Sequence, residues 1–298
     1  MGYTIEKIWE VGFLSTALTI QDLSCLGRAA GAIALGVLQA MGMEAVLLPT
    51  AVLSTQTLFP SPVVRDLSDF LEPAAAHWQS QGIRFEGICT GYLANPGQCQ
   101  QVLAIIDQLA GPDTLVVVDP AMADNGKLYA CLSPEQPQAM RALCARADVI
   151  LPNRTEAALL TGLPMDTDPH DLCRALMQLG CREVLLTGYE AAPGSLGTLA
   201  YDGRDFAQTS HRRLPASFHG TGDLFTSVYF GARLHGCPGQ QAAELAGTFV
   251  ADAIENTPPE NGPQHRGVRY EPLLWRLGQR LQTISFSQEE PSWERNLN

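Results

Sequence analysis

The stretch Thr114-Leu-Val-Val-Val-Asp-Pro120 decides how the rest of the chain is interpreted. Its core, Leu115 to Val118, is uninterrupted and almost purely β-branched. Such a run is typical of a central strand of a parallel sheet, which is buried on both faces. The strand delivers Asp119 to its carboxyl end. The stretch therefore predicts a parallel sheet with a carboxylate at one edge.

Strand and helix patterns alternate on both sides of this stretch. Further strands are expected at residues 16–20, 44–49, 85–89, 149–151 and 183–187. Helices are expected at 28–41, 62–81, 96–109, 134–147, 155–161, 169–179, 240–255 and 270–285, with another directly after residue 220. Residues 197–201 and 206–212 flank Asp202-Gly203 and predict an antiparallel hairpin. The fold class is therefore α/β, a mainly parallel central sheet with helices on both faces and a late hairpin.

A single domain covering residues 15–286 is the simplest organisation, because the chain has no sustained repeat and no Pro/Ser-rich linker. Residues 1–14 are expected to be an N-terminal extension before the first strand, and residues 287–298 a polar C-terminal tail.

The composition narrows the range of partners. With 19 basic and 31 acidic residues the net charge is −12, which disfavours binding to nucleic acids and anionic membranes. The eight cysteines are scattered without a Cys-x-x-Cys pair, so we expect reduced core residues of a cytoplasmic protein. The most apolar stretch, 29–43, is shorter than the roughly 20 residues that span a bilayer.

Polar residues follow the predicted strands where each strand ends. Because the carboxyl ends of parallel strands meet at one edge, where ligands of such sheets bind, we expect these residues to lie together. They are Asp22, Thr50, Tyr92, Asp119, Asn153 and Thr187. Asp119, Asp124, Asn153 and Glu156 offer hard oxygen ligands of the kind that suit Mg²⁺. Asn153 and Glu156 also have the spacing of a helix-capping pair, and the capping and ligand roles can coexist.

The segment Phe218-His-Gly-Thr-Gly-Asp-Leu-Phe225 is predicted to be a loop that enters a helix. Gly220, Thr221 and Gly222 permit a tight turn, and the helix start directs free N–H groups and its positive dipole end forward. This is an anion site. Asp223 in the first turn is suited to accept a proton from an attacking hydroxyl; its alternative role is a plain helix cap.

Signatures of other enzyme classes are missing from the sequence. It has neither Gly-x4-Gly-Lys-Ser/Thr nor Gly-x-Gly-x-x-Gly after the first strand, which argues against a P-loop or a dinucleotide Rossmann site. It also lacks His-Glu-x-x-His and Gly-x-Ser-x-Gly, the signatures of zincins and α/β-hydrolases.

Six motifs together resemble the ribokinase-like superfamily and, within it, the pyridoxal/pyridoxamine kinases. The resemblance extends from about Ile20 to Thr257. The motifs are Ile20-Gln-Asp-Leu-Ser24, Leu48-Pro-Thr-Ala-Val-Leu-Ser-Thr55, Gly91-Tyr-Leu93, Val118-Asp-Pro-Ala-Met-Ala-Asp-Asn-Gly-Lys-Leu-Tyr129, Pro152-Asn-Arg-Thr-Glu156 and Gly220-Thr-Gly-Asp-Leu-Phe225. Their order and spacing make the match specific.

The resemblance implies a three-layer sandwich, commonly a homodimer, that phosphorylates the 5′-hydroxymethyl group of a B6 vitamer with ATP. Asp223 would be the base, and the amides of Gly220, Thr221 and Gly222 the anion hole. The resemblance also implies that Asp119, Asn153 and Glu156 organise Mg²⁺, its waters and the ATP phosphates. Thr187 and Gly188 would lie against the nucleotide phosphates, and Asp22, Thr50 and Tyr92 would line the pocket for the pyridine ring. A requirement for a monovalent cation such as K⁺ stays open.

Three positions depart from the family pattern. Ala123 replaces a usual glycine, Gln56 stands where relatives often carry histidine, and Asp22 stands where many pyridoxal kinases carry serine. Alternative functions are therefore a hydroxymethylpyrimidine or sugar kinase of the same superfamily, or a non-catalytic vitamer- or nucleotide-binding protein.

Overall fold

The structure is a computed structural model that describes residues 15–214, 218–258 and 266–285. The expected N-terminal extension (1–14) and the expected polar tail (287–298) lie outside the described residues, as does residue 286. Within the described part of the chain, no helix is long and apolar enough to cross a membrane.

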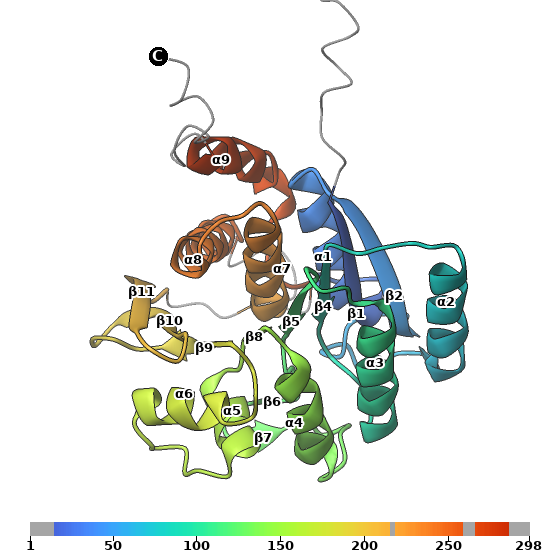
Figure 1. Cartoon of the computed structure of the whole chain (residues 1–298). Helices are drawn as coiled ribbons and strands as arrows, with labels where there is room; N and C mark the ends of the chain where they lie inside the picture. The colour runs from blue at the N-terminus through green and yellow to red at the C-terminus, as the bar shows by residue number, and fades with distance from the viewer. Residues whose placement is uncertain (1–14, 215–217, 259–265, 286–298) are drawn as a thin grey trace, which may run out of the picture.

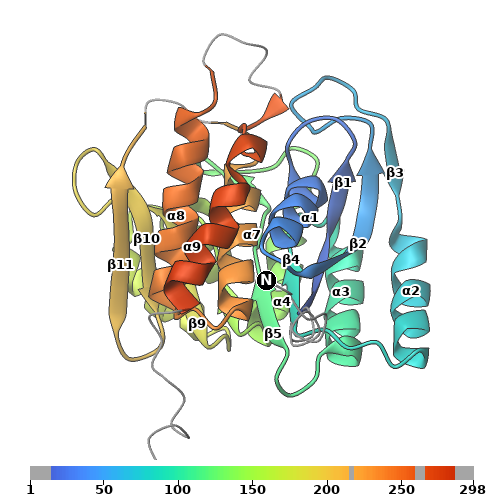
Figure 2. The ribbon, with the colours of Figure 1, turned by 90° about the horizontal axis from the view of Figure 1, so that it is seen from above.

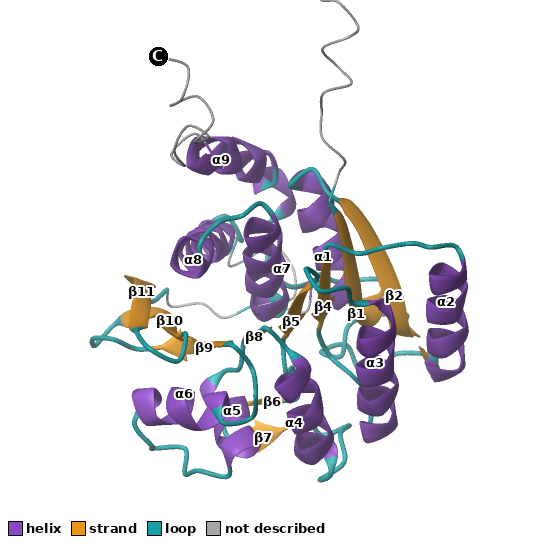
Figure 3. Ribbon diagram, in the orientation of Figure 1, coloured by secondary structure: helices purple, strands orange, loops and turns teal. Residues whose placement is uncertain are grey.

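Nine strands in the described residues form one sheet in the order β11-β10-β9-β8-β5-β4-β1-β2-β3. Figure 3 labels these strands except β3, which Figure 2 shows beside β2. Six central strands are parallel: β1 (Thr16–Ser24), β2 (Glu44–Leu53), β4 (Gly87–Thr90), β5 (Leu115–Val118), β8 (Val149–Ile150) and β9 (Glu183–Tyr189). The hairpin β10 (Ser195–Tyr201) and β11 (Phe206–Arg212) continues the sheet antiparallel to β9. The predicted fold class is confirmed.

Helices cover both faces of this sheet (Figure 1). One layer contains α1 (Ala30–Ala40), α7 (Thr221–Leu234), α8 (Gly239–Glu255) and α9 (Trp275–Ser285), which Figure 2 shows in front of the strands. The other contains α2 (Ser68–Ser80), α3 (Pro96–Leu109), α4 (Gln136–Arg146), α5 (Arg154–Thr161) and α6 (Pro169–Met177). Each helix layer buries its own apolar cluster against the sheet. Strand β5 contributes side chains to both clusters, with Val117 on one face of the sheet and Val118 on the other.

The expected helix over residues 62–81 is wrong at its start. Val64–Asp66 is a short edge strand, β3, antiparallel to the end of β2. Helix α2 begins only at Ser68, whose N–H donates to Asp66 Oδ1 over 2.8 Å. The β-branched pair Val63-Val64 favours the strand, and the open edge of β2 supplies its partner.

The expected last helix is also shorter than predicted. A 3₁₀ turn, η3 (Glu271–Leu273), precedes α9, which begins at Trp275. A small hairpin of β6 (Ala123–Asp124) and β7 (Lys127–Leu128) was not predicted. Its turn is Asn125-Gly126, with φ of 51° and 74°. Asn-Gly is the preferred pair for such a turn, so the signal was present in the sequence.

Six of the eight cysteines are buried and all eight are free, as predicted for core thiols. Cys25 and Cys131 differ, because both are exposed. They lie in segments that follow the first strand and the small hairpin, near the sheet edge that carries the predicted site.

Candidate active site

A cleft of about 640 Å³ runs along the carboxyl ends of β5, β8 and β9 and faces the start of α7. The β10–β11 hairpin and α8 form its outer wall. Its lining includes the predicted residues Asp119, Asn153, Glu156, Thr187, Gly188, Gly220, Thr221, Gly222 and Asp223. The tertiary fold thus brings together residues more than 100 positions apart in the sequence.

The two glycines of the loop before α7 differ in their backbone conformation and in the space around them. Gly220 has φ of 84°, and a Cβ there would collide with the carbonyl oxygen of Arg28 and with Ile33. Gly222 is exposed, and a Cβ there would meet nothing within 4 Å. Gly220 therefore lets the chain pass close to the start of α1, whereas Gly222 leaves the space in front of the helix N-terminus open. That space suits an anion.

Asp223 is held at the start of α7 by a backbone group from another element. Its Oδ2 accepts a hydrogen bond of 2.9 Å from the N–H of Ala30. Burial raises the pKa of the Asp223 carboxyl, against the lowering effects of the Ala30 N–H and of nearby His219. A carboxyl with a raised pKa and a fixed orientation is suited to general-base work.

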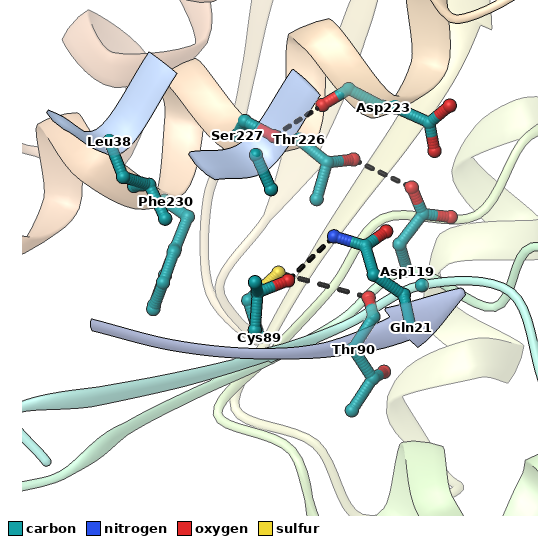
Figure 4. A pocket seen from close by; sticks show the side chains of 12 residues that line it. Gln21, Leu38, Cys89, Thr90, Asp119, Asp223, Thr226, Ser227 and Phe230 are labelled. Carbon is teal, nitrogen blue, oxygen red and sulfur yellow. Dashed lines mark hydrogen bonds between the residues drawn. The ribbon is translucent and has the colours of Figure 1, made fainter. Parts of the chain in front are cut away.

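Asp119 lies beside Asp223 and is tied to the same helix. Thr226, one turn after Asp223, donates a hydrogen bond of 2.7 Å from Oγ1 to Asp119 Oδ2. Figure 4 shows the side chains of Asp119, Thr226 and Asp223 together at one end of a small pocket of about 10 Å³, which has room for about one water molecule. Burial and the charge of Asp223 raise the pKa of Asp119 to about 7, while the Thr226 hydroxyl opposes the shift.

Asn153 and Glu156 form a capping box at the start of α5. Asn153 Oδ1 accepts from the Glu156 N–H over 3.0 Å, and Glu156 Oε2 accepts from the Asn153 N–H over 2.9 Å. Glu156 Oε1 accepts from the N–H groups of Met122 and Ala123 over 3.1 and 3.4 Å. Burial, then the charge of Asp119, raises the pKa of Glu156 well above its ordinary value. Asn153 and Glu156 therefore form the helix-capping pair that their spacing allows. Both carboxylate oxygens of Glu156 already accept hydrogen bonds from backbone N–H groups.

Ala123, which departs from the family pattern, is accommodated without a left-handed backbone. It is fully buried in β6, its carbonyl oxygen accepts from Asn153 Nδ2 over 2.8 Å, and its φ is not positive. The structure therefore requires no glycine at this position.

Thr187 and Gly188 lie at the end of β9 on the floor of the cleft. Thr187 forms an isolated bridge with Asn153, and its N–H donates to the Pro152 carbonyl over 2.9 Å. Gly188 has φ of 68° and lies at the register shift between β9 and β10, where Thr187 and Tyr189 pair with Thr198 and Gly197. Thr187 and Gly188 both line the cleft as predicted.

Asp22, Thr50 and Tyr92 do not line this cleft. Asp22 and Thr50 are buried at the ends of β1 and β2. The ring centroid of Tyr92 lies 6.4 Å from that of Tyr129, a residue of the cleft lining. Its hydroxyl lies 3.1 Å from Cys131 Sγ. These three residues, which were expected to contact the pyridine ring, therefore lie outside the cleft that contains Asp119, Asn153 and the Gly220 loop.

The carboxylates of this cleft can hold an Mg²⁺ ion only if water molecules supply most of its ligands. In the described ranges, no group of three or more His, Cys, Asp and Glu side chains could hold a metal. Asp119 has one carboxylate oxygen that accepts no side-chain or backbone hydrogen bond there. Mg²⁺ commonly keeps several waters and contacts protein through one or two carboxylates. The donor set therefore fits Asp119 as a direct ligand and Glu156 as a partner of its waters.

Several residues that line the site were not identified from the sequence. Thr226 is three positions after Asp223, a spacing that places both on one helix face, so this signal was available. The cleft wall also contains His211, Gly247, Val250 and Ile254 from β11 and α8. These wall residues lie outside every motif quoted above.

The family model for phosphomethylpyrimidine kinase matches residues 29–268. The chain belongs to this family. A Bordetella pertussis relative, described as a pyridoxine/pyridoxal/pyridoxamine kinase, is 30% identical to this kinase over 254 residues, 80% of this chain and 88% of the relative. The crystal structure of Lactobacillus plantarum pyridoxal kinase matches with a TM-score of 0.84 at 33% identity, covering 93% of this chain and 100% of that one.

A Bacteroides thetaiotaomicron protein solved with pyridoxal also resembles this kinase, with a TM-score of 0.84 at 32% identity over 89% of this chain and 96% of that one. The predicted resemblance to the ribokinase-like pyridoxal kinases is confirmed, and the chain is a kinase of the pyridoxal/hydroxymethylpyrimidine kinase family.

Proposed function

We propose that this kinase transfers the γ-phosphoryl group of ATP to the 5′-hydroxymethyl group of a B6 vitamer. One observation carries the proposal: Asp223, oriented by the Ala30 N–H, stands in the first turn of α7 next to the open space in front of Gly222. A base and an anion site are therefore adjacent, as in-line transfer to a hydroxyl requires.

The residues of the cleft have different roles in the proposed phosphoryl transfer. Asp223 accepts the proton of the vitamer hydroxyl, and the N–H groups at the start of α7 stabilise charge on the transferring phosphoryl group. Thr187 and Gly188 face the nucleotide phosphates, while Gly247, Val250 and Ile254 of α8 offer a small and apolar wall for the adenine. A bound Mg²⁺, held by Asp119 and through water by Glu156, would neutralise phosphate charge.

Hydroxymethylpyrimidine is the second candidate substrate, because the matching family model is that of phosphomethylpyrimidine kinase. Both substrates are flat nitrogen heterocycles with a hydroxymethyl group, so the same base and anion site serve either one. A non-catalytic binding protein is disfavoured by the retained and oriented Asp223.

The test is ATP consumption in the presence of Mg²⁺ with pyridoxal, pyridoxamine, pyridoxine or hydroxymethylpyrimidine. We expect turnover of at least one vitamer and a loss of about a thousandfold or more in Asp223→Ala. Turnover of hydroxymethylpyrimidine alone would replace the vitamer by the second candidate. Vitamer binding without any turnover would instead support a binding protein.

A homodimer is a separate proposal that rests on the family resemblance. Light scattering of the purified chain at micromolar concentration tests it, and a mass near 32.1 kDa would contradict it.

A further inference from the structure

Residues 266–270 lie across the segments that lead into α1 and α7. The N–H of Arg28, just before α1, donates to the carbonyl oxygen of Arg266 over 2.9 Å. The N–H of Val268 donates to the carbonyl oxygen of His219, just before α7, over 3.1 Å. The 266–270 segment therefore joins the start of one helix to the start of the other, although α1 and α7 are remote in the sequence.

The side chain of Arg28 is also bound on this side of the molecule. Its Nε forms an ion pair of 2.6 Å with Glu271 Oε1, and its Nη1 lies 3.4 Å from the carbonyl oxygens of Arg266 and Gly267. The Glu271 side chain is 46% exposed, so the pair adds little to overall stability. These contacts instead fix the position of Arg28 relative to the 266–270 segment.

Arg28 is next to both parts of the proposed catalytic machinery. Its carbonyl oxygen packs against Gly220, where a Cβ would collide with it. Two residues further on, the N–H of Ala30 donates to Asp223 Oδ2 over 2.9 Å. A movement of Arg28 would therefore shift the Gly220 loop and the Asp223 carboxylate together. Phosphoryl transfer is sensitive to such a shift, because a misplacement of about 1 Å costs up to about a hundredfold in rate.

We propose that Arg28, held by Glu271 and the 266–270 segment, is a positioning residue that aligns Asp223 with the anion site before α7. The inference rests on the proposed kinase function, which gives Asp223 its role as the base. Arg28 is not among the described residues that line the cleft. It therefore acts through Gly220 and Asp223 and not by touching a substrate.

The test compares Arg28→Met and Glu271→Gln with wild type by steady-state kinetics at varied ATP and varied vitamer. Met keeps the unbranched stem of Arg28 and removes the charge and the N–H donors. Arg146→Met is the matched control, because Arg146 Nε also forms an ion pair of 2.6 Å, with Asp107 Oδ1, in the helix layer on the other face of the sheet. Arg28→Lys is the conservative variant, since it keeps the positive charge beside Glu271.

We expect kcat to fall about tenfold or more in Arg28→Met and in Glu271→Gln, with both KM values within about threefold of wild type. The double variant should be no slower than Arg28→Met alone, because the two residues act as one pair. Arg28→Lys should recover kcat to within about threefold, and Arg146→Met should leave it unchanged. Thermal unfolding should fall equally, by about 3 °C at most, in Arg28→Met and Arg146→Met. A kcat in Arg28→Met near that of wild type would overturn the inference.

A second measurement does not depend on turnover. Hydrogen exchange of the backbone amides, followed by mass spectrometry, reports whether the N–H of Ala30 stays bonded to Asp223. We expect the peptide that contains Ala30 to exchange about tenfold faster in Arg28→Met and at the wild-type rate in Arg146→Met. If wild type turns over neither a vitamer nor hydroxymethylpyrimidine, the proposed function fails while the exchange rate still decides the role of Arg28. Unchanged exchange in Arg28→Met would overturn that role.

Discussion

The backbone N–H of Ala30 donates a 2.9 Å hydrogen bond to Asp223 Oδ2, joining residues 193 positions apart. Ala30 has φ of 45°, a left-handed conformation that is uncommon for a residue with a Cβ. The bond links the first turn of α1 to the first turn of α7, and these helices pack together in one layer. A strained backbone that orients the proposed base is an arrangement expected of a functional site.

Replacing Asp223 by Asn tests the role of this side chain as a base separately from its positioning by the Ala30 N–H. Asn keeps an oxygen that can accept from the Ala30 N–H, so the fold and nucleotide binding should persist, while the base is lost. We expect kcat to fall about a thousandfold, with the KM for ATP unchanged within about threefold. Steady-state kinetics at varied ATP measures both, and a kcat near wild type would show that Asp223 is not the base.

The two loop glycines should respond differently to alanine. In Gly220→Ala the new Cβ collides with the Arg28 carbonyl and must adopt φ of 84°, so we expect a loss of about 3 kcal/mol in the free energy of unfolding. In Gly222→Ala the Cβ enters open space in the cleft, so stability should hold while kcat/KM falls about tenfold or more. Urea unfolding and kinetics on both variants check this, and equal destabilisation by the two would contradict it.

Thr226 should act as a positioning residue for Asp119. Thr226→Val removes the 2.7 Å hydrogen bond but keeps the shape, whereas Thr226→Ser keeps a hydroxyl. We expect Val to raise the Mg²⁺ concentration for half-maximal activity about tenfold and Ser to restore most of the affinity. Titration of activity with Mg²⁺ at fixed ATP measures the change. A lower kcat at unchanged Mg²⁺ dependence would indicate a purely structural role.

Asp22 should make the stability of the ligand-free protein depend on pH. Its pKa is about 7 in the fold against an ordinary value of 3.8, so the folded state holds the extra proton between these values. The protonated Asp22 carboxyl therefore stabilises the folded state fully below about pH 4, and this stabilisation is lost as the pH rises through about 7. Asp223 and Tyr92 are the titratable groups coupled to it, and both remain in Asp22→Asn.

We expect the unfolding midpoint of wild type to fall more between pH 5 and 8 than that of Asp22→Asn, by on the order of 5 °C. Differential scanning calorimetry at matched ionic strength measures the two profiles. Parallel profiles would mean that Asp22 titrates near its ordinary pKa.

Much of the fold was predictable because the β-branched strands and the strand–helix alternation are local signals. The run Leu115–Val118 and the Asp202-Gly203 turn mark a parallel strand and a hairpin without any long-range information. The start of α2 was not predictable in the same way. Val64–Asp66 forms a strand by pairing with the open edge of β2, and a sequence pattern does not show which edge is open.

The sequence by itself determined which residues end the parallel strands, and hence that Asp119, Asn153 and Thr187 meet at one edge, whereas the tertiary structure decided that the Gly220 loop joins them. The shared edge of the strands follows from topology, since parallel strands share their carboxyl ends. Only the tertiary structure decided which partner each side chain has. Asp223 takes the Ala30 N–H, Asp119 takes Thr226, and Asp22 has no cation. Those pairings depend on distances between elements remote in the sequence, which are set by packing in the two helix layers.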